Sequence, residues 1–221
     1  MGFDFNYMLG LLPILLKYLG TTMEMAIWGL FFALILSLIL ANIRVFKIPV
    51  LDQLSQLYIS FFRGTPLLVQ LFLLYYGLPQ VFPWMVGLDA FGAAVIGLTL
   101  HFAAYMAESI RAAIIGIDRS QMEASLSVGM TTSQAMRRVI LPQATRVALP
   151  SLMNYFIDMI KSTSLAFTLG VAEIMAKAQM EASSSFRFFE AFLAVALIYW
   201  GVVVILTRIQ IWAEVKLNKA Y

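Results

Sequence analysis

The sequence contains no cysteine, a single histidine (His101) and few charged residues, which make up 12% of the chain. An ordinary soluble domain carries about a quarter charged residues. Without cysteine there can be no disulfide framework, no thiolate metal site and no cysteine nucleophile. These absences narrow the range of enzymes and metalloproteins to which the chain could belong.

Several sequence motifs of catalytic and ligand-binding sites are also missing. The sequence has no GxxxxGK[ST] loop for nucleotide phosphates and no zinc-ligand spacing. No nucleophile elbow accompanies His101, so a serine hydrolase site is not indicated. We therefore expect no catalytic residues, no metal and no cofactor bound by this chain. The net charge of +3 could favour nucleic acid, but basic residues in an apolar chain usually mark cytoplasmic loops, so no nucleic-acid partner is expected.

Apolar residues dominate what is present. They make up 62% of the 221 residues, more than a water-soluble core of this size could bury. The sequence predicts an all-α polytopic membrane protein with one transmembrane domain over 1–221, a core over 19–213 and no internal repeat. About five spans are expected, over Glu24–Arg44, Leu54–Leu78, Phe91–Ile114, Arg146–Phe167 and Ala191–Trp212.

The N-terminal segment 4–18 is predicted to form an interfacial helix whose length Pro13 limits. It lacks the basic region and small-residue cleavage site of a signal peptide, so we expect the first membrane helix to be retained.

Lysine and arginine mark the cytoplasmic side. They flank the first and third connections and follow the last span, whereas the connection GLPQVFPWMVGLD has none. The fourth connection has two basic residues, Lys177 and Arg187, offset by Glu173 and Glu181. This pattern predicts an external N-terminus, an internal C-terminus and a cytoplasmic loop over 118–142.

That loop includes the polar stretch EASLSVGMTTSQAMRRVILPQA, which begins at Glu123. Ser120 with Glu123, and Thr131 with Gln134, are spaced as capping boxes. Gly129 suits the left-handed residue that ends a helix, which predicts two short helices joined by a glycine turn, the second ending before Pro142. A solvated loop would explain the polar residues, but its apolar groups favour docking of a partner: Met122, Leu126, Met130, Met136, Val139 and Ile140.

The same loop resembles the EAA loop of ATP-binding-cassette importer permeases. The residues at matching spacing are Glu123, Ala124, Gly129, Leu141 and Pro142, while Ser125 replaces the second alanine of the motif and Val139 its usual isoleucine. Upstream FFRGTPLLVQLFLLYYGLP and downstream KSTSL are similar to the polar amino acid branch, which includes histidine, glutamine, arginine and cystine permeases. YYGLPQ, IRAAI and LIYW are closest to the cystine permeases.

The resemblance implies a type I importer permease fold in a bacterial plasma membrane, surrounded by lipid. It also implies a second permease subunit (an identical copy or a paralogue), cytoplasmic ATPases that hold ATP and Mg, and an extracellular or periplasmic solute-binding protein. The EAA residues, Ser125 included, would couple the ATPase to transport of a polar amino acid such as L-cystine. A passive channel and a signalling receptor are the alternatives from the residues alone.

Asn154, Asp158 and Lys161 share one face of the fourth predicted helix at i, i+4 and i+7. Ionisable groups inside a membrane usually face a cavity or a partner. A carboxylate and a cation suit the two charges of an amino acid, but Asp158 and Lys161 could equally neutralise each other. Contact of this helix with solute is what the resemblance implies, and Ser162 extends the predicted site to the KSTSL segment.

His101, Tyr105 and Glu108 form a similar stripe on the third predicted helix, and His101 and Tyr105 are included in the predicted substrate site. His101 could be an interhelical donor instead of a ligand, and Glu108 with Arg111 is interpreted as structural or gate-related.

In RGTPLLVQ, Pro66 removes a backbone donor. The freed backbone beside Thr65, with Gln70 one turn beyond, either lines a cavity or is a plain proline kink. We include Thr65 and Gln70 in the predicted substrate site.

Overall fold

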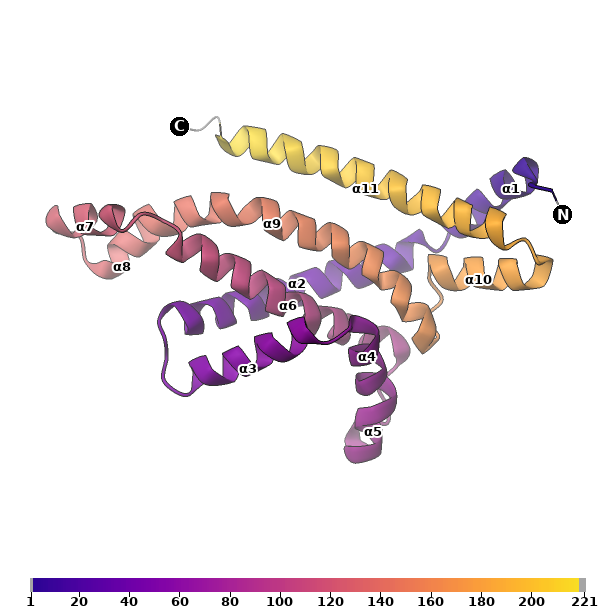
Figure 1. The fold of residues 1–221 in the computed structure, drawn as a ribbon, viewed down its shortest axis with the longest axis horizontal. Coiled ribbons are helices and arrows are strands. Elements are labelled where there is room, and N and C mark those ends of the chain that lie inside the picture. Colours follow the sequence, from indigo (N-terminus) through magenta and orange to yellow (C-terminus); the bar gives the residue numbers. More distant parts are fainter. Residues whose placement is uncertain (1, 219–221) are drawn as a thin grey trace.

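The computed structural model describes residues 2–218, which are helical with no strand among them. The five longest helices are α2 (Leu19–Val45), α3 (Leu51–Gly64), α6 (Ala90–Ile115), α9 (Leu141–Ser162) and α11 (Phe188–Asn218). Shorter elements join them: α1 (Phe5–Leu16), α4 (Leu67–Phe72), the π-helix η1 (Leu73–Gly77), α5 (Leu78–Val81), the 3₁₀ turn η2 (Pro83–Met85), α7 (Arg119–Ser127), α8 (Thr132–Ala135), the π-helix η3 (Met136–Ile140), the 3₁₀ helix η4 (Thr163–Leu169) and α10 (Ile174–Ser185). Figure 1 shows the long helices running roughly side by side.

Three helices of the described chain, α2, α6 and α11, are each long and apolar enough to cross a membrane. Two further spans result if each of two bent helix pairs is counted once, which agrees with the five expected from sequence. The prediction of an unbroken second span over Leu54–Leu78 is wrong, because the chain turns by 111° between α3 and the segment 67–81. Pro66 is extended, at ψ 137°, and has no N–H to continue the helix.

The main core lies where α2, α6 and α9 meet. Small side chains on facing helices let the backbones approach closely, as is common in membranes where apolar burial alone does not drive packing. Ala33 of α2 and Ala94 and Ala103 of α6 are buried in this core. Gly29 of α2 is also buried, and a β-carbon there would lie 3.0 Å from Met159 Sδ of α9. Thr99 donates to the Gly29 carbonyl oxygen across this contact, at 3.5 Å. The junction therefore depends on residues with little or no side chain.

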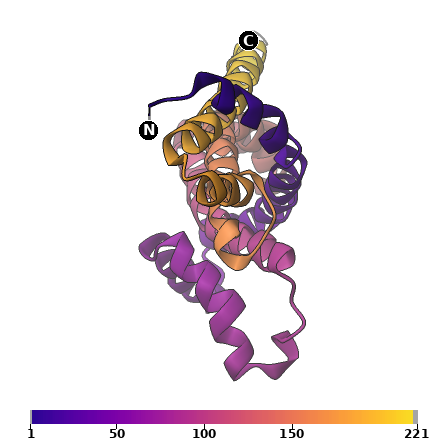
Figure 2. The same ribbon diagram turned by 90° about the vertical axis from the view of Figure 1, so that its right-hand side faces the viewer.

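A second core joins α1 to α10 and to the N-terminal part of α11 (Figure 2). Helix α1 confirms the helix expected over 4–18, and Asp4 caps it by accepting the Tyr7 N–H at 2.9 Å. Pro13, however, does not limit the helix at its own position, because α1 continues to Leu16. Pro13 removes one hydrogen bond from α1. The helix continues past it because Leu11, before the proline, and Leu15, after it, both pack against α10 and α11.

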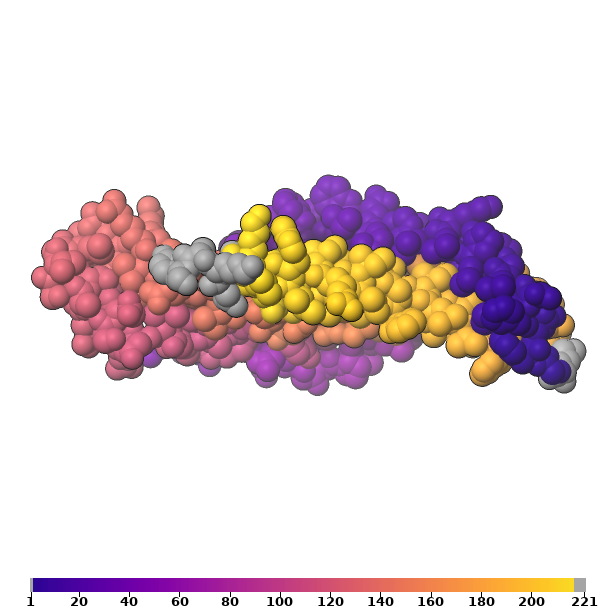
Figure 3. Space-filling model, turned by 90° about the horizontal axis from the view of Figure 1, so that it is seen from above, coloured from indigo at the N-terminus to yellow at the C-terminus, as the bar shows by residue number. Residues whose placement is uncertain are grey.

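The connections with an excess of basic residues gather at one end of the molecule. In Figure 1 the α2–α3 connection, α7, α8 and the C-terminal end of α11 lie towards the left, and α1 and the α10–α11 turn lie at the right. From above, α11 lies along the molecule and α7–α8 project beyond its end (Figure 3). The predicted cytoplasmic connections are thus on one side of the structure.

We expect Gly97→Val to destabilise the protein, because a β-carbon at Gly97 would lie 2.4 Å from Leu71 Cδ2. Leu71 is 1% exposed, and its Cγ would lie only 3.5 Å from the added β-carbon, so the buried side chain would have to shift. Overpacking of this kind costs about 1–3 kcal/mol. Thermal unfolding of the purified protein in detergent should show a lower midpoint than wild type. Gly201→Val is the matched control, since nothing lies within 4 Å of a β-carbon there, and an equal loss in both variants would contradict the prediction.

Candidate functional site

The backbone break before α4 is held by the side chain of Gln70. Its Nε2 donates to the carbonyl oxygens of Phe62 and Thr65, both at 3.0 Å, and to Thr65 Oγ1 at 2.8 Å. In a continuous helix the Phe62 carbonyl would accept from residue 66, which is proline and has no N–H. Gln70 is 5% exposed, so its amide replaces the missing donor from inside the protein. The Thr65 hydroxyl donates in turn to the Phe61 carbonyl at 2.8 Å.

His101 anchors the other end of this side chain. Its Nδ1 lies 3.0 Å from Gln70 Oε1, and an amide oxygen only accepts, so Nδ1 carries the proton. The structure thus gives His101 the interhelical donor contact that the sequence left as one of two possibilities. The contact joins α6 to α4 across the break.

Tyr105, one turn further along α6, extends the group. Its ring lies 5.1 Å from the His101 ring, and the Arg63 guanidinium stands 5.5 Å from its centroid. Its hydroxyl donates to the Arg63 carbonyl at 3.4 Å, and its ring is 5.9 Å from that of Tyr155 on α9. The structure therefore brings Thr65, Gln70, His101 and Tyr105 together around the end of α3, as a group we call the break cluster.

The second polar group is the stripe on α9, the helix whose Tyr155 contacts Tyr105 of the break cluster. Asn154, Asp158 and Lys161 are all exposed, which confirms that they share one face. Lys161 Nζ pairs with Asp158 Oδ1 at 2.6 Å, and each side chain keeps about half its exposure, at 53% and 51%. No hydrogen bond or ion pair within residues 2–218 joins this stripe to the break cluster. The α9 stripe thus presents both signs of charge on an open surface.

At the end of α9 the chain changes from α to 3₁₀ geometry after the half-buried Ser162. The Thr163 hydroxyl donates to Ile160 and the Ser164 hydroxyl to Lys161, both at 2.7 Å. The serine and threonine hydroxyls therefore satisfy carbonyl oxygens where the helix geometry changes.

Glu108 and Arg111 form a two-fold hydrogen-bonded ion pair, with Arg111 Nε 3.0 Å from Glu108 Oε2 and a second contact between Nη2 and Oε1. A separate pair, Arg44 with Asp52 at 3.0 Å, joins α2 to α3. The structural interpretation of Glu108 and Arg111 is consistent with this geometry.

The first helix of the predicted cytoplasmic loop begins earlier than the sequence indicated. Asp118 is the cap of α7, accepting the Ser120 N–H at 2.9 Å, and this hydrogen bond lowers the pKa of Asp118. The Ser120–Glu123 capping box is therefore wrong, because Asp118 takes the capping position two residues before it. Glu123 is left exposed on the helix surface.

The glycine turn and the second capping box are confirmed. Gly129 has φ +87°, and nothing lies within 4 Å of a β-carbon there. Thr131 Oγ1 accepts the Gln134 N–H at 3.2 Å, and Gln134 Oε1 accepts the Thr131 N–H at 2.9 Å.

Pro142, by contrast, does not end the second helix. The chain passes from α8 through the π-helix η3 directly into α9, with Pro142 in the first turn of α9. Proline removes a donor and crowds the carbonyl four residues earlier, and a π turn is one way of accommodating such a defect within a helix. The loop is thus joined to α9 by unbroken helical structure.

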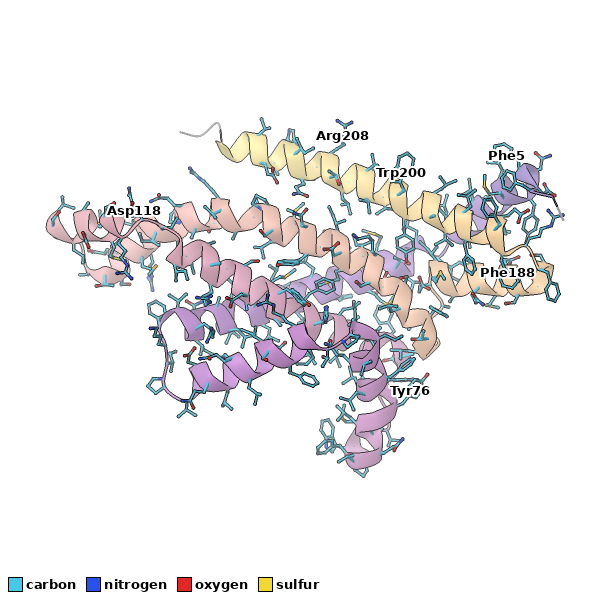
Figure 4. All side chains as sticks on the ribbon, viewed as in Figure 1. Phe5, Tyr76, Asp118, Phe188, Trp200 and Arg208 are labelled. Atoms are coloured by element: carbon cyan, nitrogen blue, oxygen red, sulfur yellow. The ribbon has the colours of Figure 1, made fainter. Side chains whose placement is uncertain are left out.

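The apolar groups of the loop divide into an inner and an outer set. Ile140 is 4% exposed, whereas Leu126 is 44% and Val128 74% exposed. Ala124, Leu141 and Pro142 are exposed too, while Ser125 is 5% exposed and its hydroxyl donates to Gln121. The sequence did not indicate that Val128 is exposed. Its position just before Gly129 was the one feature that could have suggested it. Leu126 on α7 and Val128 directly after it form an apolar tip. Helix α7 lies at the outer end of the molecule, and Asp118, labelled in Figure 4, marks where it begins.

Comparison with known proteins identifies this arrangement. Residues 29–219 match the family described as "Binding-protein-dependent transport system inner membrane component". The probable amino-acid ABC transporter permease protein PatM of Vibrio harveyi is 94% identical over 100% of this chain and 99% of its own. The L-cystine transport system permease protein TcyL of Bacillus subtilis is 39% identical over 99% of this chain and 93% of its own.

A solved structure, "Crystal structure of an amino acid ABC transporter with histidines", contains a chain with 34% identity and a TM-score of 0.89, covering 98% of this chain and 100% of that one. The helical architecture is thus that of the ABC importer permeases, as the sequence indicated. In this family ATP hydrolysis is carried out by a separate ATPase subunit, and a binding protein and a second permease complete the system. Because the family match spans most of its length, the chain belongs to the inner membrane components of binding-protein-dependent transport systems and, within them, to the amino-acid ABC transporter permeases.

Proposed function

We propose that this permease carries a polar amino acid into the cell by alternating access driven by a partner ATPase. One observation carries the proposal: the α7–α8 loop projects from the predicted cytoplasmic end, exposes an apolar tip and continues as helix into α9. A passive channel needs no docking surface for a cytoplasmic partner. In a receptor the charged α9 stripe would have no transport role. In this proposal 118–142 is the coupling loop of one permease domain that spans 1–221.

The proposed docking surface consists of Glu123, Ala124 and the apolar tip on α7, with Leu141 and Pro142 at the start of α9. Gly129 sets the angle between α7 and α8, and Ser125 holds the first helix by its bond to Gln121. ATP and Mg would be held by the ATPase, which draws this loop with it when nucleotide binds.

Movement of the loop would reach the solute site through η3 and α9. These segments form one continuous helical rod from Thr132 to Ser162, and the α9 stripe lies on its far half. ATP affects transport only if it favours one of two conformations, and a rod shared by both sites provides the physical link.

The α9 stripe is the proposed contact for the amino acid. Asp158 would meet the ammonium group, Lys161 the carboxylate, and Asn154 and Ser162 would supply neutral hydrogen-bonding groups. The side chains of Asp158 and Lys161 are about half exposed. An amino acid can therefore take the place of either partner in the ion pair without first exposing a buried charge. Thr65 and Tyr105 would line the pathway, while Gln70 and His101 hold the backbone break in position.

L-Cystine or a related amino acid is the proposed substrate, supported by the similarity to TcyL over almost the whole chain. It would be delivered by a solute-binding protein to a pair of permease subunits, formed either by two copies of this chain or by this chain and a paralogue.

We expect reconstituted vesicles that contain the complete transporter and its binding protein to accumulate labelled L-cystine only when ATP is present on the ATPase side. Accumulation against a gradient requires the coupled conformational cycle described above. Scintillation counting of filtered vesicles measures it, with competition by unlabelled amino acids to define specificity. Equal uptake with and without ATP would refute the importer, and ATP-driven uptake of other amino acids alone would refute only cystine.

Asp158→Asn should lower ATP-driven uptake at least about tenfold, because one lost charge-assisted hydrogen bond contributes about 1.5–3 kcal/mol. Co-purification of the subunits should be unchanged. Glu181→Gln is the control, since Glu181 forms a comparable ion pair with Lys177 at 2.8 Å on α10, away from the α9 stripe. Normal uptake by Asp158→Asn would remove this carboxylate from the site.

Gly129→Val should weaken binding of the ATPase, since a β-branched residue strains the backbone at φ +87° by about 1–3 kcal/mol without any steric clash. The fraction of ATPase that co-purifies with the permease reports the effect. Gly201→Val introduces the same side chain on α11, outside the loop and with nothing within 4 Å of its β-carbon, and should leave co-purification intact. Full recovery of ATPase with Gly129→Val would argue against the turn as a determinant of docking.

A further inference from the structure

A groove between α2, α6 and α9 runs along the half of the bundle that leads to the coupling loop. Its volume is about 320 Å³, within the range of small-molecule sites. Its walls are almost wholly apolar, with Leu34 and Leu38 from α2, Ile110 and Ile114 from α6, and Ala148 and Leu152 from α9. Leu38 and Leu141 are 50% and 37% exposed, so the groove opens on the protein surface.

A second hollow of about 440 Å³ continues the first towards the loop. The two share Asn42 and Leu141 as lining residues, so they adjoin. The second hollow has a different chemical character, because Thr132, Ser133 and Arg137 line it together with Phe46 and Met136. Together the two adjoining hollows, called the cavity below, are apolar along most of their length and polar and basic at one end.

The basic end is suited to an anion. Arg137 is exposed, and within residues 2–218 no carboxylate forms an ion pair with it. No acidic residue lines either hollow. Thr132 and Ser133 add two exposed hydroxyl groups beside the guanidinium. Arginine with neighbouring hydroxyls is a common arrangement for holding a phosphate group.

The position of this end fits the membrane interface. Phe46 is 57% exposed at the end of α2, next to Lys47 in the α2–α3 connection. Aromatic and basic residues gather where hydrocarbon meets the headgroups of the cytoplasmic leaflet. From Leu141 to Leu152 the groove follows α9 for about 16 Å at 1.5 Å per residue, which is a substantial part of one leaflet's hydrocarbon depth.

We propose that one anionic glycerophospholipid of the cytoplasmic leaflet occupies this cavity. One acyl chain lies in the apolar groove, and the phosphate meets Arg137, Thr132 and Ser133. A lipid fits better than a protein segment because the cavity pairs an apolar wall of acyl-chain length with a single basic end. The lipid would contact α2, α6, α8 and α9 at once and brace η3, the π-helix that joins the coupling loop to α9.

Native mass spectrometry of the transporter, purified with its ATPase and titrated with dioleoyl-phosphatidylglycerol or dioleoyl-phosphatidylcholine, tests the proposal. Wild type should bind one phosphatidylglycerol per permease in preference to phosphatidylcholine. Arg137→Gln should weaken phosphatidylglycerol binding about fivefold, the effect of one basic residue at an anionic headgroup. Arg138→Gln removes the neighbouring exposed arginine, which lines neither hollow, and should bind as wild type does.

A second pair of variants tests the apolar groove. Thr145→Trp places a large ring in the groove from an exposed lining position and should reduce binding of both lipids several-fold. Val147→Trp, at a residue 60% exposed and outside the lining, should not. Wild-type binding in both Arg137→Gln and Thr145→Trp would overturn the proposal. Absence of bound lipid from the wild-type complex would also overturn it.

Discussion

The bond from Gln70 to the backbone around Pro66 is the interaction on which the arrangement of the first half of the chain depends. A carbonyl oxygen without a donor is costly where water is scarce, so a broken membrane helix needs a replacement donor. Gln70 supplies it to Phe62 and Thr65, and His101 fixes the amide from α6. The chain can then turn by 111° after α3 without leaving these groups unsatisfied.

The second half of the chain is organised around helical continuity. The π-helix η3 lets Pro142 lie within helical structure, so α8, η3 and α9 act as one element. The proposed docking tip on α7 therefore connects mechanically to the proposed solute contacts on α9. The proposed lipid site borders the same π-helix, where the helix geometry is least regular.

Local structure was predicted correctly where a segment carried a single local signal. Thr131 and Gln134 form the capping box that their spacing predicts, and Gly129 adopts positive φ, as a helix-ending glycine does. Prediction failed where two local signals competed. Asp118 displaced Ser120 as the cap of α7, and Pro142 was absorbed by a π turn that short-range rules do not anticipate.

The sequence by itself determined that the chain is surrounded by lipid, how many apolar spans it has, which connections are basic and which family motifs it contains. These properties follow from composition and from spacing within a single helix. It also placed Asn154, Asp158 and Lys161 on one face. Only the tertiary structure decided that Gln70 turns inward to the break, that Arg137 lines a hollow next to an apolar groove and that Val128 is exposed. Those outcomes depend on contacts between helices distant in the chain, and a one-dimensional pattern does not specify which helix faces meet.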